Sequence, residues 1–433
     1  MHRRGAFPFI VGVALILVTA TGARAASGDL DPTFGGDGIV RTDLSPNEDD
    51  GFAVTVQPDG KIVVVGERGI GGPNPRVAIV RYETDGSLDT SFGGGDGNVS
   101  IDFTRRDDFA YAVRIQDDGK IVVAGAGAYS GRSSRFALAR VTPDGSLDPT
   151  FGRDGRVMTD VTPSYDWANG MALQANGKIV VVGSISAGPR NGKIAVLRYR
   201  ADGTLDPRFS GNGIVRADPT RTFDDGLAIG VEADGQIIVA GGAGFTGPNE
   251  RFVALAYGRD GSLDPTFGGD GMVFTDITPS ADVPFGLAIQ GDGKIVVAGG
   301  GAQGEADPKF ALARYERDGS LDPTFAGDGT VITNFTPHDD GAYSVALDPA
   351  GRIVAAGLAG NNGSVPRFAA ARYLTDGTLD STFGGDGKVT RDITAYFDSA
   401  WGVAVQADGS VVCSGVAGAG GSHPSIAVLR YKH

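Results

Sequence analysis

The stretch Leu30-Asp31-Pro32-Thr33-Phe34-Gly35-Gly36-Asp37-Gly38 decides the fold, because near-copies of it return six more times along the 433-residue chain. The spacing between copies is 58 residues, or 59 once, where Gly93–Gly95 carries an extra glycine. The repeated phenylalanines are Phe34, Phe92, Phe151, Phe209, Phe267, Phe325 and Phe383. A fixed period of this length indicates one supersecondary unit that is copied and stacked. We therefore expect an array or a closed ring rather than a conventional enzyme domain.

The third copy contains four short apolar runs, Arg156–Asp160, Gly170–Leu173, Lys178–Gly183 and Lys193–Tyr199. Each is rich in Val and Ile and is bounded by Gly, Asp, Asn or Pro, which is typical of strands. The dipeptide Asn176-Gly177, replaced by Asp-Gly in most other copies, favours a tight hairpin because it tolerates positive φ. Four antiparallel strands repeated seven times, with no helical period, predict an all-β seven-bladed β-propeller. A solenoid is the alternative.

Side-chain size predicts the order of the strands within a blade. In the second run of each copy, small residues alternate with larger apolar ones, as in Ala53-Val54 and Gly170-Met171, which suits the crowded strand nearest the ring axis. The strand that follows the Leu-Asp-x-x-Phe motif is then outermost. The chain starts with such a strand, Gly38–Asp43, and ends with the inner three, Gly402–Tyr431. We predict that the N-terminal strand joins the C-terminal blade and closes the ring, which hides both free edges.

Residues 1–25 have the layout of a cleaved secretory signal. A basic start at Arg3 and Arg4 precedes an apolar run from Phe7 to Ala20 and the sequence Ala23-Arg24-Ala25. A membrane anchor is the alternative, but the run is shorter than the roughly 20 residues that a spanning helix needs. We expect cleavage near Ala25, export to the periplasm or the medium, no membrane insertion, and a single propeller domain over residues 26–433.

The composition is strongly acidic, with 52 Asp and Glu against 38 Lys and Arg, three of which lie in residues 1–25. This charge disfavours nucleic acid and anionic membranes as partners and suits divalent cations or basic partners. The one cysteine, Cys413, excludes an intramolecular disulfide and occupies a place that holds valine or alanine in the other copies, so we expect a buried apolar side chain. We also expect a monomer.

Several repeated residues are interpreted as scaffold. Leu30 and Phe34, with their counterparts, would wedge between blades, and Asp31 and its counterparts would accept backbone N–H bonds in a tight turn. An arginine that ends the fourth strand is expected to pair with a blade aspartate. It is present in six copies, as Arg81, Arg140, Arg198, Arg314, Arg372 and Arg430, and Ala256 takes its place in the remaining one.

The combination of Leu-Asp-x-x-Phe-Gly-x-Asp-Gly with Asp-Gly-Lys-Ile-Val-Val-Ala-Gly resembles the bacterial delta-60 repeat family, over residues 28–431. The resemblance implies an exported or surface-associated repeat protein with a propeller-like fold. It supplies no catalytic residues.

The segment from each outermost strand to the next innermost one follows the formula Asp-x-[Ser/Thr]-x-x-x-Asp. Its acidic positions are Asp43, Asp49, Asp102, Asp108, Asp160, Asp166, Asp218, Asp224, Asp276, Asp282, Asp340, Asp392 and Asp398, with Asn334 as the one replacement. These side chains could cap local turns. Alternatively, they could offer oxygen ligands to Ca²⁺, although neither the EF-hand spacing nor the glycine-rich nonapeptide is present.

Connections in an up-and-down blade alternate between faces, so the Asp-Gly turns share one face of the ring. The aspartate segments share the other with the loops between third and fourth strands, such as Glu67–Pro75, which differ among copies. Variable loops on a rigid scaffold are where binding usually resides. Just inside this face lie Phe52, Tyr111, Phe285, Tyr343 and Trp401, with Asn169 and Leu227 in the other two copies. These aromatics could stack on a sugar or a peptide, or fill space between blades.

Three functional hypotheses follow. The first is an exported binding module for a protein, peptide or glycan, with no required cofactor. The second is a structural or surface component rigidified by Ca²⁺. The third is a hydrolase that uses paired carboxylates, which is disfavoured because every copy offers the same pair. The four histidines are scattered, and no Gly-x-Ser-x-Gly elbow or zinc-spaced cluster is present.

Overall fold

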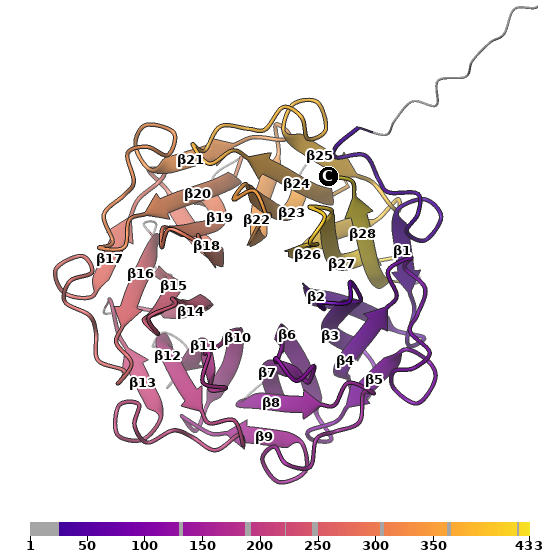
Figure 1. Cartoon of the computed structure of the whole chain (residues 1–433), viewed down its shortest axis with the longest axis horizontal. Coiled ribbons are helices and arrows are strands. Elements are labelled where there is room, and N and C mark those ends of the chain that lie inside the picture. Colours follow the sequence, from indigo (N-terminus) through magenta and orange to yellow (C-terminus); the bar gives the residue numbers. More distant parts are fainter. Residues whose placement is uncertain are drawn as a thin grey trace, which may run out of the picture.

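The computed structural model describes residues 26–129, 133–186, 192–220, 222–244, 250–303, 307–361, 365–421 and 424–433. The predicted signal segment and parts of the variable loops lie outside the described residues. The described residues form 28 β-strands, and none of them belongs to a helix that could cross a membrane. Seven separate four-stranded antiparallel sheets stand around a central axis, so the chain is a seven-bladed β-propeller, as the repeat predicts (Figure 1).

Each blade contributes one strand to each of four concentric positions. The innermost strands are β2 (Glu48–Val56), β6 (Asp107–Ile115), β10 (Tyr165–Leu173), β14 (Asp224–Val231), β18 (Ala281–Ile289), β22 (Asp339–Leu347) and β26 (Phe397–Val405). The next are β3 (Ile62–Ile70), β7 (Ile121–Tyr129), β11 (Ile179–Ser186), β15 (Ile237–Ala243), β19 (Ile295–Gln303), β23 (Ile353–Asn361) and β27 (Val411–Ala419).

The third position holds β4 (Arg76–Tyr82), β8 (Arg135–Val141), β12 (Gly192–Tyr199), β16 (Arg251–Tyr257), β20 (Lys309–Tyr315), β24 (Arg367–Tyr373) and β28 (Ser425–Tyr431). The outermost strands are β5 (Asn98–Ile101), β9 (Arg156–Thr159), β13 (Ile214–Ala217), β17 (Met272–Thr275), β21 (Thr330–Thr333), β25 (Lys388–Arg391) and β1 (Ile39–Thr42). This order confirms the arrangement predicted from side-chain size.

The ring closes through the first strand of the chain. β1 pairs antiparallel with β28, with Ile39 opposite Leu429, and completes the sheet that contains β26 and β27. In Figure 1 the indigo start of the chain therefore lies beside its yellow end. The predicted closure is confirmed.

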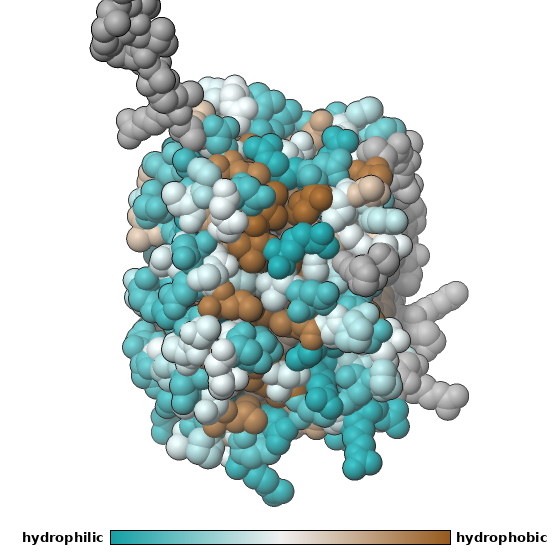
Figure 2. Space-filling model, turned by 90° about the vertical axis from the view of Figure 1, so that its right-hand side faces the viewer, coloured by the Kyte–Doolittle hydropathy of each residue, from teal (hydrophilic) through white to brown (hydrophobic). Residues whose placement is uncertain are grey.

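The hydrophobic core lies between blades rather than within one. It consists of seven clusters, each of which joins two neighbouring blades and contains one of the repeated phenylalanines. Phe34, for example, packs with Val54 of one blade and Val412 of its neighbour and is fully buried. The phenylalanines are thus the predicted wedges. On the outer side of the ring, hydrophilic side chains predominate and apolar ones gather in small patches (Figure 2).

The repeated arginine holds the end of each blade together. Arg81 Nε donates to Asp89 Oδ2 at 2.6 Å, and the guanidinium carbon lies 4.4 Å from the centre of the Phe92 ring. Asp89 Oδ1 also accepts from the backbone N–H of Ser91 at 2.9 Å. Where Ala256 replaces the arginine, the side-chain amide of Gln236 donates to the corresponding aspartate. These contacts confirm the scaffold interpretation of both residues.

The innermost strands are longer than the sequence indicates. The expected strand Gly170–Leu173 is the second half of β10, which begins at Tyr165. Asp166 and its counterparts consequently lie at the start of the inner strands rather than in a connecting loop. The first halves of these strands escape detection because each strand is interrupted by a bulge, which breaks the two-residue alternation.

Candidate ligand-binding site

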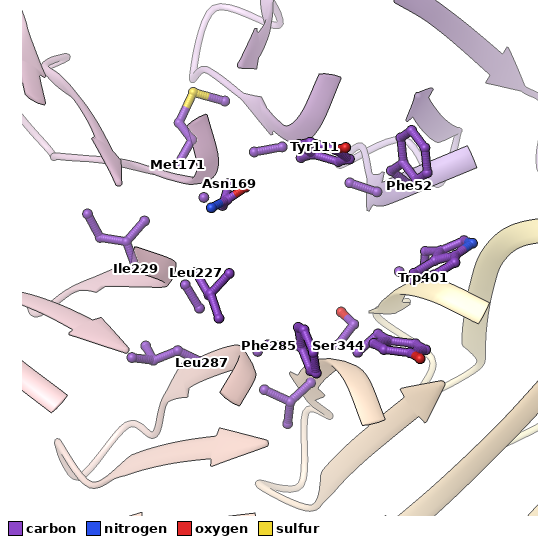
Figure 3. A pocket seen from close by; sticks show the side chains of 18 of the residues that line it. Phe52, Tyr111, Asn169, Met171, Leu227, Ile229, Phe285, Leu287, Ser344 and Trp401 are labelled. Atoms are coloured by element: carbon purple, nitrogen blue, oxygen red, sulfur yellow. The ribbon is translucent and has the colours of Figure 1, made fainter. Parts of the chain in front are cut away.

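The innermost strands surround a central cavity of about 580 Å³, to which all seven blades contribute. This volume is in the range of small-molecule binding sites. One residue of each blade forms a ring within it, namely Phe52, Tyr111, Asn169, Leu227, Phe285, Tyr343 and Trp401. In the close-up view, aromatic rings occupy one side of the cavity, and the aliphatic side chains of Met171, Ile229 and Leu287 face them from the other (Figure 3).

A β-bulge places these seven residues. In every blade the pairing between the inner strand and its neighbour shifts register at one common position, and the residue passed over there is the one that joins the ring: Phe52 in β2, for instance. A bulge bends the strand and re-aims a side chain. It also pushes the carbonyl oxygen of Asp50 so close to Gly66 that a Cβ there would overlap it. The glycine that ends each Lys-Ile-Val-Val-x-Gly segment is therefore a requirement of the bulge.

Five of the ring residues form a continuous aromatic arc over consecutive blades. Neighbouring ring centres are 5.1 Å apart for Phe285 and Tyr343, 4.6 Å for Tyr343 and Trp401, 6.2 Å for Trp401 and Phe52, and 4.9 Å for Phe52 and Tyr111. These are the separations of attractive, tilted aromatic pairs. The five residues predicted as ligand contacts are thus brought together along one wall of the cavity.

A second run of rings continues the arc. The ring centres of Phe109 and Tyr111 are 5.0 Å apart, and the rings are tilted relative to each other. Further ring contacts through Tyr129 and Tyr165 lead to Trp167, which also lines the cavity. The chain has two tryptophans, Trp167 and Trp401, and both face the cavity. Their fluorescence can therefore report on its contents.

Among the described residues that line the cavity, Arg114 is the one that carries a charge. It lies in β6, three residues beyond Tyr111, and is exposed. Its Nη1 donates to the carbonyl oxygen of Val113 at 2.8 Å. Sequence reasoning missed this residue. The signal was available, because the six counterparts are uncharged and mostly small: Thr55, Ala172, Gly230, Ala288, Ala346 and Ala404.

A pair of carboxyl groups lies in the first blade. Along the direction of the inner strands, this pair lies before the ring of seven residues, whereas Arg114 lies after it. Asp50 and Glu67 are direct cross-strand neighbours in β2 and β3. Burial, reinforced by neighbouring carboxylates, raises the pKa of Asp50 to about 7 and that of Glu67 to about 8. Burial and the same two groups raise the pKa of Tyr111 to about 12. Sequence reasoning missed this pair as well, because the place of Glu67 is acidic in the first copy alone.

A similar pair occurs in the fourth blade, where Asp225 occupies the place of Asp50. Burial raises the pKa of Asp225 to about 6, and burial together with the Asp225 and Asp282 charges raises the pKa of Glu250 to about 8. The aspartates of the two pairs lie in β2 and β14, which are on opposite sides of the ring (Figure 1).

The second aspartate of each repeated segment is buried and holds backbone groups. Asp49 Oδ2 accepts from the N–H groups of Leu44 and Ser45 at 2.7 and 2.9 Å, and Oδ1 accepts from the Ser45 hydroxyl and the N–H of Gly69 at 2.8 and 2.9 Å. Its counterparts Asp108, Asp166, Asp224, Asp282, Asp340 and Asp398 are buried in the same way. Each of these carboxylates joins the segment before the inner strand to the rest of its blade.

The first aspartate of each segment has different partners. Asp102 pairs with Arg76 at 3.3 Å, Asp160 with Arg135 at 3.3 Å and Asp218 with Lys193 at 2.6 Å, at the start of the third strand of a blade. Asp276 and Asp392 pair likewise with Arg251 and Arg367, and Asp43 is exposed. Within the described ranges, no three His, Cys, Asp or Glu side chains are grouped so that they could hold a metal ion.

Six segments of the chain match the family described as "Domain of unknown function (DUF5122) beta-propeller": residues 57–92, 116–151, 174–209, 232–267, 290–325 and 349–383. Each segment begins at an Asp-Gly or equivalent turn and ends at one of the repeated phenylalanines. Phe34, in the first motif, is the one repeated phenylalanine that lies outside the matched segments. The seventh unit is divided between the two ends of the chain by the ring closure. The chain is a β-propeller repeat protein. No curated protein matches its sequence.

Solved structures share the fold at low identity. An ulvan lyase of polysaccharide lyase family PL25, bound to -[GlcA(1-4)Rha3S]-, is 12% identical, with a TM-score of 0.52 and coverage of 91% of this chain and 96% of that one. The periplasmic gluconolactonase of Pseudomonas aeruginosa is 16% identical, with a TM-score of 0.45 over 81% of this chain and 87% of that one. An extracellular domain from B. thetaiotaomicron is 11% identical, with a TM-score of 0.46; 91% of this chain is covered, but only 40% of that one. The likeness to the ulvan lyase shows the fold alone.

Proposed function

We propose that this protein is an exported binding module that holds a saccharide in the aromatic-lined cavity of its central channel. The observation that carries the proposal is the aromatic arc, in which five consecutive blades present rings to one cavity. The C–H faces of pyranose rings pack well on aromatic faces, and rigid aromatic side chains give a large contact area at a small cost in conformational entropy.

Two further observations support the proposal. A propeller of the same fold, the ulvan lyase, is described as bound to a saccharide, which is an analogy at the level of the fold. Residues 1–25 have the composition of an export signal, and we propose cleavage near Ala25. The delta-60 resemblance agrees with export. We propose binding rather than carboxylate hydrolysis because the two aspartates of each repeated segment have separate partners: Asp108 holds backbone N–H groups, and Asp102 pairs with Arg76.

Fluorescence titration of residues 26–433 tests the proposal, since both tryptophans face the cavity. The ligands are neutral and acidic hexasaccharides and, as competing occupants, unstructured peptides. We expect a saturable change with at least one saccharide. Tyr343→Ala, which leaves both reporters in place, should weaken binding about ten-fold, as loss of a central aromatic contact does.

Two variants serve as controls. Tyr343→Phe keeps the ring and should bind as the wild type does, and Tyr396→Ala removes a tyrosine that is 52% exposed and does not line the cavity. Saturable binding of peptides alone would replace the saccharide by a peptide ligand. Binding that is indifferent to Tyr343→Ala would place the ligand outside the aromatic arc and refute the proposal.

A further inference from the structure

Arg114 breaks the seven-fold repetition of the channel. Six blades present alanine, glycine or threonine at this position, and the second blade alone presents a guanidinium. The counterparts are too small to reach far from their strands, and Arg114 is exposed. A cation so placed is not needed to hold a neighbouring blade, because that task belongs to the arginines that end the third-position strands, such as Arg81 and Arg140.

No carboxylate of the described residues pairs with Arg114. Its guanidinium donates to a backbone carbonyl, and the surrounding protein lowers the pKa of the guanidinium with no acidic group to oppose the shift. An arginine stays protonated in such surroundings. The cavity therefore carries one uncompensated positive charge in a chain of formal net charge −14.

The position of Arg114 relative to the aromatic arc suits a ligand that engages both. Tyr111 belongs to the arc, and Arg114 follows it by three residues along β6, a step of about 10 Å in an extended strand. A saccharide packed on the aromatic arc would reach Arg114 with its next sugar ring or with a substituent. The fork of N–H donors in a guanidinium matches carboxylate and sulfate oxygens, with which it forms paired, charge-assisted hydrogen bonds.

We propose that Arg114 is the specificity-determining residue of the cavity and that the saccharide bound there is acidic, with a carboxylate or sulfate group held by the guanidinium. This inference rests on the proposed function for its ligand class. The presence of an anion site at Arg114 can be tested without any saccharide.

The first test uses quenching of tryptophan fluorescence by iodide and by uncharged acrylamide at constant ionic strength. A positive charge in the cavity raises the local concentration of iodide around Trp167 and Trp401, and the effect is strongest where screening is weak. We expect the ratio of iodide to acrylamide quenching to fall roughly two-fold in Arg114→Gln and to persist in Arg114→Lys. Arg153→Gln, at an exposed outer position, removes the same charge and should leave the ratio unchanged. An unchanged ratio in Arg114→Gln would overturn the anion site.

The second test uses matched ligands. Hexagalacturonate and its methyl ester differ in carboxylate charge and in one methyl group per residue, and a κ-carrageenan hexasaccharide and its desulfated form differ in sulfate. We expect the charged member of one pair to bind about ten-fold more tightly, which corresponds to about 1.4 kcal/mol. Arg114→Gln should abolish this preference and leave the affinity for the neutral member unchanged. Which pair shows the preference identifies the anionic group.

The outcomes separate this inference from the proposed function. Equal affinity for both members of each pair, or a preference that persists in Arg114→Gln, would overturn the acidic ligand while the saccharide site stands. If no saccharide binds, both the proposed function and the acidic saccharide fail, and the iodide ratios alone decide whether Arg114 forms an anion site. The circular dichroism of each variant checks that the fold is retained.

Discussion

Arg430 and Asp31 form an ion pair that joins the two ends of the chain. Arg430 Nε and Nη2 lie 2.9 and 2.7 Å from Asp31 Oδ2, although 399 positions separate the residues. The guanidinium carbon lies 4.8 Å from the centre of the Phe34 ring, and Nη1 donates to the carbonyl oxygen of Thr84 in the next blade. The closing blade therefore repeats the arginine contacts of the blades formed by continuous chain.

We predict that Arg430→Ala lowers the free energy of unfolding by about 3 to 5 kcal/mol, because it leaves a buried carboxylate without its partner. Urea unfolding of residues 26–433 measures the change. Arg198→Ala removes the equivalent contact with Asp206 from an internal blade, and the loss should be smaller there, because Lys178 still pairs with that carboxylate at 2.8 Å. A much smaller loss for Arg430→Ala would mean that the ring is not held closed by this contact.

The two aspartates of one segment should differ sharply in their contribution to stability. Asp49→Ala removes an acceptor of four hydrogen bonds and should cost about 3 kcal/mol, since buried N–H groups lose a charged partner. Asp43→Ala, in the same segment but exposed, should change stability by less than about 0.5 kcal/mol. Equal effects would contradict the scaffold role assigned to Asp49.

Calcium should leave the melting temperature of the mature protein unchanged. The buried aspartates already hold backbone donors, and five of the six outer aspartates pair with Arg or Lys, so neither set offers a prepared cation site. Thermal melts in EDTA and in millimolar Ca²⁺ test this expectation. A melting temperature that rises with Ca²⁺ would show preferential binding to the folded state and would revive the calcium hypothesis.

Stability should fall as the pH rises from about 4 to about 8. Asp50 and Glu67 have pKa values of about 7 and 8 in the folded protein, whereas in the unfolded chain they titrate at about 4. The folded state therefore binds more protons in this window, and the free energy of unfolding decreases as those protons are lost. The contribution is fully present below the unfolded pKa.

The double variant Asp50→Asn and Glu67→Gln mimics the protonated pair and should be more stable than the wild type at pH 8, with a shallower decline between pH 5 and pH 8. Part of the decline should persist, because Asp225 and Glu250 titrate in the same sense. Asp117→Asn, at an exposed turn, is the control. A decline as steep as that of the wild type would refute the assignment.

The sequence allowed the ring, its strand order and its closure to be predicted, because the period and the alternation of Ala53 with Val54 are properties of the whole fold. It also predicted that the repeated arginine pairs with a blade aspartate, and for Arg81 the structure shows that this aspartate is Asp89. The bulge at Phe52 could not be predicted from alternation, because a bulge is a break in that alternation. Arg114 was overlooked for the opposite reason: attention to what the copies share hides a residue that one copy alone possesses.

The closure of the ring has a consequence for synthesis. β1 is made first, and its pairing partner β28 is made last, so the first strand has no neighbour until the final residues emerge. Six blades can assemble as they leave the ribosome or the export channel, whereas the seventh must await the return of residues far away in the chain. We therefore expect the pairing of β1 with β28 to be the slowest step of folding, and until it occurs the ring of the newly made protein stays open.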